Sequence, residues 1–246
     1  AGDDSGTGAS GDDSVATGAG ADTVAGGQGD DTIALGANDG AQDVVVLSDG
    51  DGSDIVQQFE APIDNGNGTY TGQDQLDVSG LTSDGGTTPV TTNDVTVGND
   101  GFGNAVLSFP GGESITLVGV APSEVDGVAE LVAIGIPDGR DFIVEGTASA
   151  DRIDTGYTGD PEGDRVDALD SASGSNDVVL DAGAGNDPVV AGLGDALVYG
   201  STGNDSLLGG DGNDLVSIGT PEGSDRILLD DGNDILDGGS AGSGFY

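Results

Sequence analysis

Single aliphatic residues recur at intervals of nine near the start of the chain. Reading from Gly8, three consecutive units, GASGDDSVA, TGAGADTVA and GGQGDDTIA, place Val15, Val24 and Ile33 at one position. Each of them stands in the middle of a very short run that glycine-rich stretches enclose. One side chain in such a run points inward, so each unit adds one residue to a thin stacked core. The glycine-rich half can only be a turn, because successive glycines permit positive φ. The pattern predicts short strands joined by glycine turns and repeated along the chain.

A second array of the same design begins at Gly146 with GTASADRID and resumes after an insertion. Its aliphatic residues are expected two positions after each aspartate, at Ile153, Val179, Val189, Val198, Leu207, Val216, Ile227 and Leu236. This array is less regular, because Ala196 stands where an aspartate is expected and the spacing slips around 177–187 and 214–225. Pro188 occupies a strand position, where its missing N–H would weaken a ladder of hydrogen bonds.

Residues 60 to 145 lose the nine-residue period and contain short β-type runs at 95–97, 105–109 and 114–118. Pro110-Gly111-Gly112, between the last two runs, predicts a hairpin turn. This region therefore reads as antiparallel β.

Other features of this middle region predict a small core of its own. We expect Phe102 and Phe109 to supply part of it, a short helical turn to open at Ala121-Pro122-Ser123-Glu124, and Val128 to Ile136 to form a buried strand. A spacer or cap over the open end of a repeat array is favoured over a ligand-binding role.

The expected fold is all-β, with two parallel β-roll arrays flanking a mostly antiparallel β module. The expected boundaries are residues 1–59 for the first array, 60–145 for the middle module and 146–246 for the second array.

The composition argues against a large conventional hydrophobic core. Only 34% of the residues are hydrophobic and 4% aromatic, and 46 acidic against 4 basic residues give a net charge of −42. Such a chain should repel nucleic acid and anionic membrane surfaces. The aspartates fall at fixed offsets from glycines and aliphatics, not in the runs of a solvated tail. Carboxylates stacked in this way repel one another, so a cation must bind among them.

The residue types that are absent narrow the choice of cation. The chain has no cysteine and no histidine, so disulfides and the ligands preferred by zinc and copper are missing. Calcium takes six to eight oxygen ligands from carboxylates and carbonyls, which the acidic turns supply. We therefore expect several Ca²⁺ ions as the staple of the fold.

The unit glycine-glycine-x-glycine-x-aspartate-x-aliphatic-x resembles the calcium-binding nonapeptide repeat of RTX proteins, and both arrays carry it. The segments Asp54 to Phe59 and Gly72 to Leu81 are similar to the way this family ends an array in a β cap. Two units make one turn of a β-roll, so residues eighteen apart should lie above one another, which pairs Asp13 with Asp31, Asp4 with Asp22, and Asp187 with Asp205.

The resemblance implies that turn aspartates and turn carbonyls hold the ions. The expected metal ligands are Asp4, Asp13, Asp22, Asp31, Asp43, Asp54, Asp151, Asp177, Asp187, Asp205, Asp214, Asp225, Asp234, Gly26, Gly29, Gly209 and Gly212. Because Ala196 and Pro188 interrupt the second array, we expect the first array to bind calcium more tightly or completely. The insertion at 159–164 resembles loops inside the arrays of large secreted members of the family, and we assign it no chemical role.

Rival chemistry finds little support. Asp49-Gly50-Asp51-Gly52-Ser53, with Glu60 twelfth, nearly spells an EF-hand loop, but Asp54 replaces the required sixth-position glycine and the flanks are not helical. Without His, Cys or Lys, the common hydrolase triads, the HExxH zinc site and the P-loop are excluded. A carboxylate pair could serve a glycosidase, but the acids stand in the turns and aromatic residues are scarce. We expect no enzyme activity.

Two functions fit these features. The first is the calcium-binding repeat region of a large secreted bacterial protein, structural or adhesive, such as a surface-layer, matrix or filament component that Ca²⁺ folds outside the cell. The second is the non-catalytic export and folding module of a secreted RTX enzyme or toxin. Expected partners are calcium ions and, as one option, further copies of the chain in extracellular assemblies, without nucleic acid or membrane insertion. The resemblance implies one-step secretion through a C-terminal signal, expected beyond Tyr246.

Overall fold

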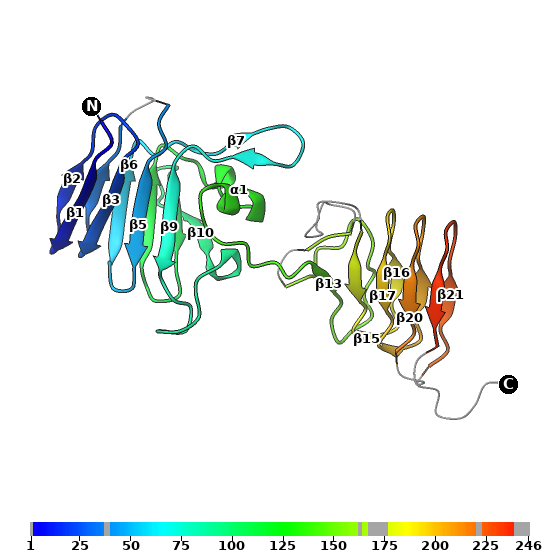
Figure 1. The fold of residues 1–246 in the computed structure, drawn as a ribbon. Coiled ribbons are helices and arrows are strands. Elements are labelled where there is room, and N and C mark those ends of the chain that lie inside the picture. The colour runs from blue at the N-terminus through cyan, green and yellow to red at the C-terminus, as the bar shows by residue number, and fades with distance from the viewer. Residues whose placement is uncertain (1, 37–39, 162–163, 167–176, 220–222, 239–246) are drawn as a thin grey trace. The chain divides into compact units, whose positions relative to one another are not determined.

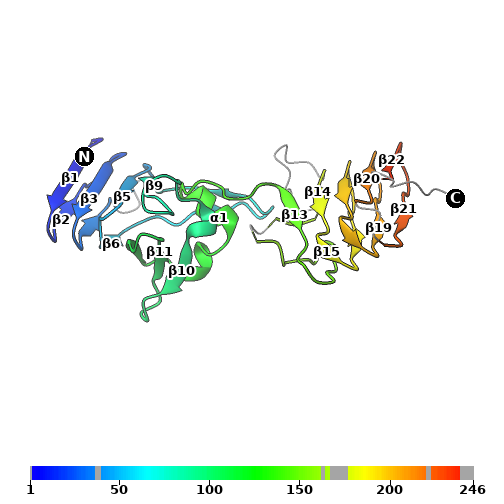
Figure 2. The ribbon, with the colours of Figure 1, turned by 90° about the horizontal axis from the view of Figure 1, so that it is seen from below.

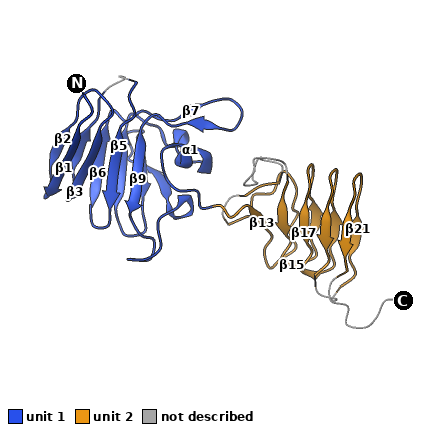
Figure 3. Ribbon diagram, in the orientation of Figure 1, with its two compact units in different colours: residues 1–139 blue, residues 140–246 orange. Residues whose placement is uncertain are grey.

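The computed structural model describes residues 2–36, 40–161, 164–166, 177–219 and 223–238, and these residues are almost entirely β. The chain divides into two compact units, residues 1–139 and residues 140–246 (Figure 3). Each unit has its own core. The first unit therefore contains both the first array and nearly all of the middle module.

The first array is a parallel roll whose strands alternate between two sheets (Figure 1). One sheet has the order β1-β3-β5-β9, and the other contains β2, β4 and β6. These strands are β1 (Ser5–Ser10), β2 (Ser14–Ala16), β3 (Thr23–Gln28), β4 (Thr32–Ala34), β5 (Val44–Ser48), β6 (Ser53–Gln57) and β9 (Gln75–Gly80). Ser5 pairs with Thr23 and Val15 with Ile33, so partners lie eighteen residues apart. The predicted two-unit turn of the roll is confirmed.

Glycine is required where one turn lies against the next. Gly27 and Gly29 have φ of 96° and 134°, in the left-handed region that favours glycine. A Cβ on Gly27 would overlap the carbonyl oxygen of Ala9 in the preceding coil. Ala9 holds the same turn position as Gly27 and has a φ of 91°, so the first coil keeps this turn despite the steric cost of a side chain.

The middle module continues both sheets of the first array. Its strand β12 pairs with β6 in parallel, and β11 and β10 extend that sheet in antiparallel fashion (Figure 2). The remaining elements are β7 (Ile63–Asp64), β8 (Tyr70–Thr71), η1 (Thr92–Asp94), β10 (Thr96–Asn99), β11 (Ala105–Ser108), β12 (Ser114–Val118), η2 (Pro122–Glu124) and α1 (Val128–Ala133). The predicted hairpin at Pro110-Gly111-Gly112 and the helical turn at 122–124 are confirmed.

Two expectations for the middle module are wrong. The apolar run from Val128 to Ile136 is not a strand, because Val128–Ala133 forms α1 and Gly135, with φ of 100°, follows its end. Phe102 is 90% exposed in the loop between β10 and β11, whereas Phe109 is buried. The loop carries Phe102 away from the core because Asp100 accepts its N–H in a tight turn.

The second unit is a second parallel roll, and it starts before residue 146. Its first strand, β13 (Ile143–Glu145), pairs with β14, and the sheet runs β13-β14-β17-β20-β22. The facing strands form the order β16-β19-β21, with β15 and β18 paired beside them. The bounds are β14 (Val179–Asp181), β15 (Ala184–Gly185), β16 (Pro188–Val190), β17 (Leu197–Tyr199), β18 (Thr202–Gly203), β19 (Ser206–Leu208), β20 (Leu215–Ser217), β21 (Arg226–Leu228) and β22 (Ile235–Asp237). Pro188 is the first residue of its strand, a position that tolerates a missing N–H.

Candidate metal centres on the turns of the two arrays

A ladder of aspartates runs along the turns of each roll. The Oδ1 atom of each aspartate accepts the backbone N–H of the residue at the same position one coil earlier. In the first unit the bonds run Asp4 to Asp22 (2.7 Å), Asp22 to Asp43 (2.9 Å), Asp43 to Asp74 (3.0 Å), Asp13 to Asp31 (2.7 Å) and Asp31 to Asp54 (2.9 Å). In the second unit they run Asp151 to Asp187 (2.8 Å), Asp187 to Asp205 (2.9 Å), Asp205 to Asp225 (2.9 Å), Ala196 to Asp214 (2.9 Å) and Asp214 to Asp234 (3.0 Å).

The second carboxylate oxygen in these turns is the chemically unusual atom. The Oδ2 atoms of Asp13, Asp22, Asp31, Asp187 and Asp214 are buried and have no hydrogen-bond partner. Leaving a buried charged oxygen without a partner costs more than a lost neutral hydrogen bond, and such atoms normally face a cation. In these five turns one carboxylate oxygen is therefore open to a metal ion. Asp74 and Asp151 differ, because Oδ2 of Asp74 accepts the N–H of Glu60 and Oδ2 of Asp151 accepts the N–H and the hydroxyl of Thr147.

Glycines shape the space around these oxygens. A Cβ on Gly26 would overlap Asp31 Oδ2, and a Cβ on Gly209 would overlap Asp214 Oδ2. Neither glycine has a positive φ, so the requirement there is for space and not for a left-handed backbone. The carbonyl oxygens of Gly29 and Gly212 lie beside Gly52 and Gly232 of the next coil. The turns thus bring carboxylate and carbonyl oxygens of neighbouring coils together.

The electrostatics of the ladder favour a bound cation. Burial raises the pKa of Asp54 to about 6, against the hydrogen bond from Asp31, and the charge of Asp31 adds to the increase. Burial likewise raises the pKa values of the ladder aspartates in the second unit, namely Asp187, Asp205 and Asp214. The ionised form of these carboxylates is therefore disfavoured unless a cation lies beside them.

The donor set fits calcium. In the part of the chain that the structure describes, no three His, Cys, Asp or Glu side chains are placed to hold a metal by themselves. Backbone carbonyls must therefore complete each site, and calcium accepts carbonyl and carboxylate oxygens together at 2.3–2.6 Å in flexible geometry. The donors are oxygens and nitrogen or sulfur ligands are missing, which disfavours zinc and copper.

The structure aligns all but one of the predicted aspartates in the ladders, and the predicted pairs Asp13–Asp31, Asp4–Asp22 and Asp187–Asp205 are confirmed as neighbours. Asp177 lies one position earlier in its turn, because Leu180 and not Val179 pairs with Val198 at the centre of the sheet. Its Oδ1 accepts the N–H of Asp195 in a parallel outer row. Ala196 does occupy an aspartate position and donates its N–H to Asp214 Oδ1.

The sequence pattern missed several buried carboxylates. Asp74 extends the first ladder, accepting N–H bonds from Asp43 and Glu60, and burial raises its pKa to about 6. Asp74 stands in Gly72-Gln73-Asp74-Gln75-Leu76, which repeats the glycine-x-aspartate-x-aliphatic part of the unit, and this partial match is the signal that could have indicated its role. Asp51 and Glu113 are each only 6% exposed and lie near one another at the edge of the first array.

The insertion after Ile153 contributes a further buried acid. Burial raises the pKa of Asp164 to about 7, with the charge of Asp160 as the next cause. Asp164 Oδ2 accepts the N–H of Phe142, which ties the insertion to the residues before β13. Glu162 and Gly163 of the same insertion lie outside the described residues.

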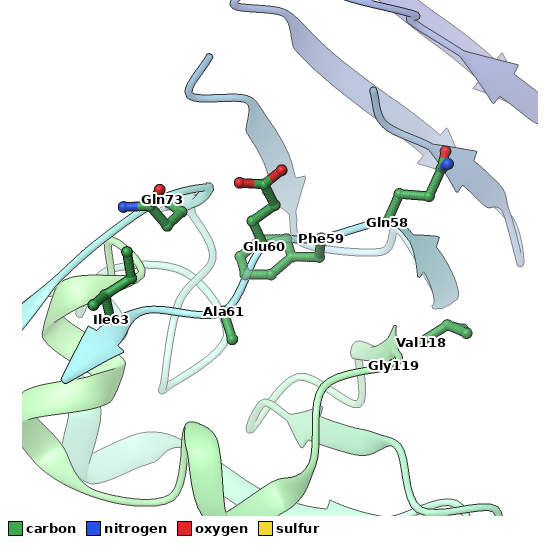
Figure 4. A pocket seen from close by; sticks show the side chains of 8 residues that line it. All are labelled: Gln58, Phe59, Glu60, Ala61, Ile63, Gln73, Val118 and Gly119. Atoms are coloured by element: carbon green, nitrogen blue, oxygen red, sulfur yellow. The ribbon is translucent and has the colours of Figure 1, made fainter. Parts of the chain in front are cut away.

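A shallow pocket of about 530 Å³ lies beside the middle module (Figure 4). The segment from Gln58 to Ile63 forms one wall, and Gln73, Val118 and Gly119 form the rest. Glu60 is the carboxylate among its lining residues, so the pocket does not offer the carboxylate pair of a glycosidase. The near-EF-hand at 49–60 is not one, because its first residues connect strands β5 and β6.

Among the described residues, none of the helices has the length and apolar character needed to cross a membrane. A search of curated proteins finds no match to the chain. The sequence profile of the RTX calcium-binding nonapeptide repeat matches in four copies, at residues 1–39, 172–198, 190–219 and 222–241. These matches fall on both rolls, and repeats of this family bind calcium ions, several to a domain. Both rolls thus carry RTX calcium-binding nonapeptide repeats, which are characteristic of secreted bacterial proteins.

Proposed function

We propose that this chain is a structural or adhesive region of a large secreted protein, in which calcium ions fold both rolls outside the cell. The observation that carries the proposal is the set of buried Oδ2 atoms without hydrogen-bond partners, repeated from coil to coil in both units.

In this proposal each turn aspartate has two tasks. Its Oδ1 fixes the preceding coil by accepting an N–H, as Asp31 does for Asp13, and its Oδ2 ligates an ion. The other expected aspartates of the ladders also ligate ions through a carboxylate oxygen, and turn carbonyls, including those of Gly26, Gly29, Gly209 and Gly212, complete the ligands. Calcium supplies the positive charge that these oxygens lack. Asp177 stands in the outer row, where its Oδ1 accepts the N–H of Asp195.

Without calcium the same arrangement opposes folding. Two carboxylates about 4 Å apart repel by roughly 4 kcal/mol at the effective dielectric constant of a protein surface. A domain is stable by only about 5–15 kcal/mol, so several such pairs suffice to unfold it. Extracellular calcium modules bind at about 0.1–1 mM, far above the free calcium inside a cell. The chain would then stay unfolded during export and fold on reaching the medium.

Two features favour a structural role over a role in the export and folding of an attached enzyme. The chain has two rolls, and the sheets of the first continue directly into the middle module through β9 and β12. The alternative, a non-catalytic export and folding module of a secreted enzyme or toxin, has the same calcium chemistry. The open reading frame of the whole protein separates the two, because a catalytic domain in it would favour the alternative.

Circular dichroism of the full chain in excess calcium and in excess EGTA tests the calcium part of the proposal. We expect the β signal and the thermal transition to disappear in EGTA and to return when calcium is restored, because binding energy becomes folding energy. Magnesium in place of calcium is the control, since it demands a smaller, near-octahedral site. A chain that keeps its β signal and transition in EGTA would refute the metal-scaffold mechanism.

A further inference from the structure

Asp51 and Glu113 form a buried acidic pair that the nonapeptide pattern does not contain. Asp51 lies in the loop before β6, and Glu113 lies in the hairpin loop before β12 of the middle module. Strands β4, β6 and β12 are consecutive in one sheet. The loop of Asp51 is therefore flanked on one side by the loop of Asp31 and on the other side by the hairpin of Glu113.

Backbone contacts hold both side chains in this position. Glu113 Oε1 accepts the N–H of Gly50 at 2.7 Å, which joins the hairpin to the loop of the first array. Asp51 Oδ2 accepts the N–H of Ser48 at 2.7 Å. Neighbouring Asp49 is engaged elsewhere, because both of its carboxylate oxygens bond Thr82.

Two unsatisfied oxygens flank the Asp51 loop. Glu113 Oε2 on one side and Asp31 Oδ2 on the other are buried and have no hydrogen-bond partner. Asp51 itself is 6% exposed, and its pKa is raised, first by burial and then by the nearby charges of Asp31 and Glu113. A buried carboxylate oxygen without a hydrogen bond, such as Glu113 Oε2 beside the Asp51 loop, is stabilised by a cation.

Gly111 leaves the space in which Glu113 folds back. A Cβ on Gly111 would overlap Glu113 Oε2. The position has no positive φ, so a side chain there would displace the glutamate carboxylate without straining the backbone. In the coil of β12, Ile115 holds the position next to Asp54, so this row of aspartates ends at Asp54. Glu113 lies two residues before that position, in the hairpin loop at the end of this edge of the roll.

We propose that Asp51 and Glu113 hold an additional calcium ion that fastens the middle module to the last turn of the first array. The remaining ligands are oxygens of the 48–52 loop and water, in keeping with the absence of any three-side-chain metal cluster among the residues described. The proposal rests on the proposed function, because it assumes that the rolls bind calcium. Its consequence is that the module docks only when the roll is loaded with calcium.

Glu113→Gln tests the site with little change in shape, because glutamine can still accept the N–H of Gly50. Asp51→Asn is the second variant, and Asp126→Asn, on an exposed aspartate of the same module, is the control that removes one charge elsewhere. Each full-length chain is equilibrated with radioactive calcium, and the ions bound per chain are counted by dialysis. We expect Glu113→Gln and Asp51→Asn each to bind one ion fewer than the unaltered chain and Asp126→Asn, and the double variant to lose no more than either single one.

Gly111→Ala tests the same site with all charges kept. Its added Cβ displaces Glu113 Oε2, so this variant should also bind one ion fewer. An unchanged count and affinity in Glu113→Gln and Asp51→Asn, or a loss of two ions in the double variant, would overturn the proposal. If the unaltered chain binds several ions and these variants bind as many, the additional site alone fails. If the unaltered chain binds none, the proposed function fails with it.

Discussion

Replacing Asp31 should loosen the first array far more than replacing Asp195 loosens the second. Asp31 is 1% exposed, its Oδ1 accepts the N–H of Asp13 at 2.7 Å, and its Oδ2 is buried without a partner. Asp195 is exposed, although its Oδ1 also accepts bonds, from the backbone and side chain of Asn213. The two aspartates therefore share a hydrogen-bonding role and differ in burial.

The magnitude follows from the hydrogen bond alone. Asp31→Ala leaves the N–H of Asp13 without an acceptor in a partly buried turn, which costs about 1–3 kcal/mol. At about 1.4 kcal/mol for each factor of ten, local opening of the coil becomes roughly 5 to 150 times more frequent, before the loss of the calcium ligand is added. Asp195→Ala removes an exposed bond and should cost less than about 1 kcal/mol.

Hydrogen exchange in excess calcium measures the two arrays separately in one sample, because it reports local opening residue by residue. We expect Asp31→Ala to lower protection in residues 5–34 by at least fivefold and to leave residues 197–217 unchanged. Asp31→Asn is the matched variant, since its amide oxygen keeps the bond from Asp13 while the charge is lost. Loss of protection in Asp31→Asn isolates the metal ligand. Equal losses from Asp31→Ala and Asp195→Ala would show that the assignment of the buried row is mistaken.

Three further expectations follow from the same turns. Gly26→Ala should raise the calcium concentration needed to fold the chain, because its Cβ would overlap Oδ2 of Asp31. Gly6→Ala, whose Cβ would meet no neighbour closer than 3.9 Å, should not raise it. A calcium titration monitored by circular dichroism compares the two variants. Calcium affinity should fall as the pH is lowered through about 6, because protons compete with calcium for Asp54, whose pKa is raised to about 6. Calorimetry at pH 5 and 7.5 measures the affinity, and equal values at the two pH values would contradict this prediction. Ala196→Asp should tighten calcium binding by the second unit, since it restores a carboxylate to the row; an unchanged calorimetric titration would count against it.

The sign of the pH effect differs between the metal-free and the calcium-bound chain. A folded-state pKa of about 6 at Asp54 and Asp74 lies above the ordinary value of 3.8. In the metal-free chain these groups therefore stabilise the fold below pH 4 and lose that contribution as the pH rises through about 6. Calcium reverses this loss, because it binds the deprotonated form. Acid should thus favour a folded, protonated apo chain while it weakens calcium binding.

The ladder could be predicted from the sequence because each of its parts is local. Asp31 and Ile33 follow a glycine turn within one unit of nine, and the same unit eighteen residues earlier supplies Asp13. Strand pairing at this spacing needs no information from distant segments. The aspartates of the regular coils were therefore found, together with the gap at Ala196.

The errors arose where local pattern does not determine the structure. The run from Val128 to Ile136 is apolar enough for a strand or a helix, and such short runs cannot be distinguished by periodicity. Asp177 was placed one residue out because its neighbours Val178, Val179 and Leu180 are all aliphatic, and only the pairing of Leu180 with Val198 settles which one points inward. Glu113 lies 63 residues from its partner Gly50, so no repeat-based argument could bring the two together.

The unequal spacing of the ladder explains how one roll can carry insertions without losing its metal sites. Successive aspartates are 18, 21 and 31 residues apart along one edge of the first unit, 18 and 23 along the other, and 36 at the start of the second. The same Oδ1 bond closes each of these coils, with donor–acceptor distances of 2.7 to 3.0 Å. Lengthening a loop from 18 to 36 residues adds only about 0.6 kcal/mol of closure entropy, which is less than one buried hydrogen bond to a carboxylate contributes. Selection on the ladder can therefore keep the aspartates aligned while the loops between them grow into new elements, of which the segment from β7 to β8, inserted between β6 and β9, is one instance.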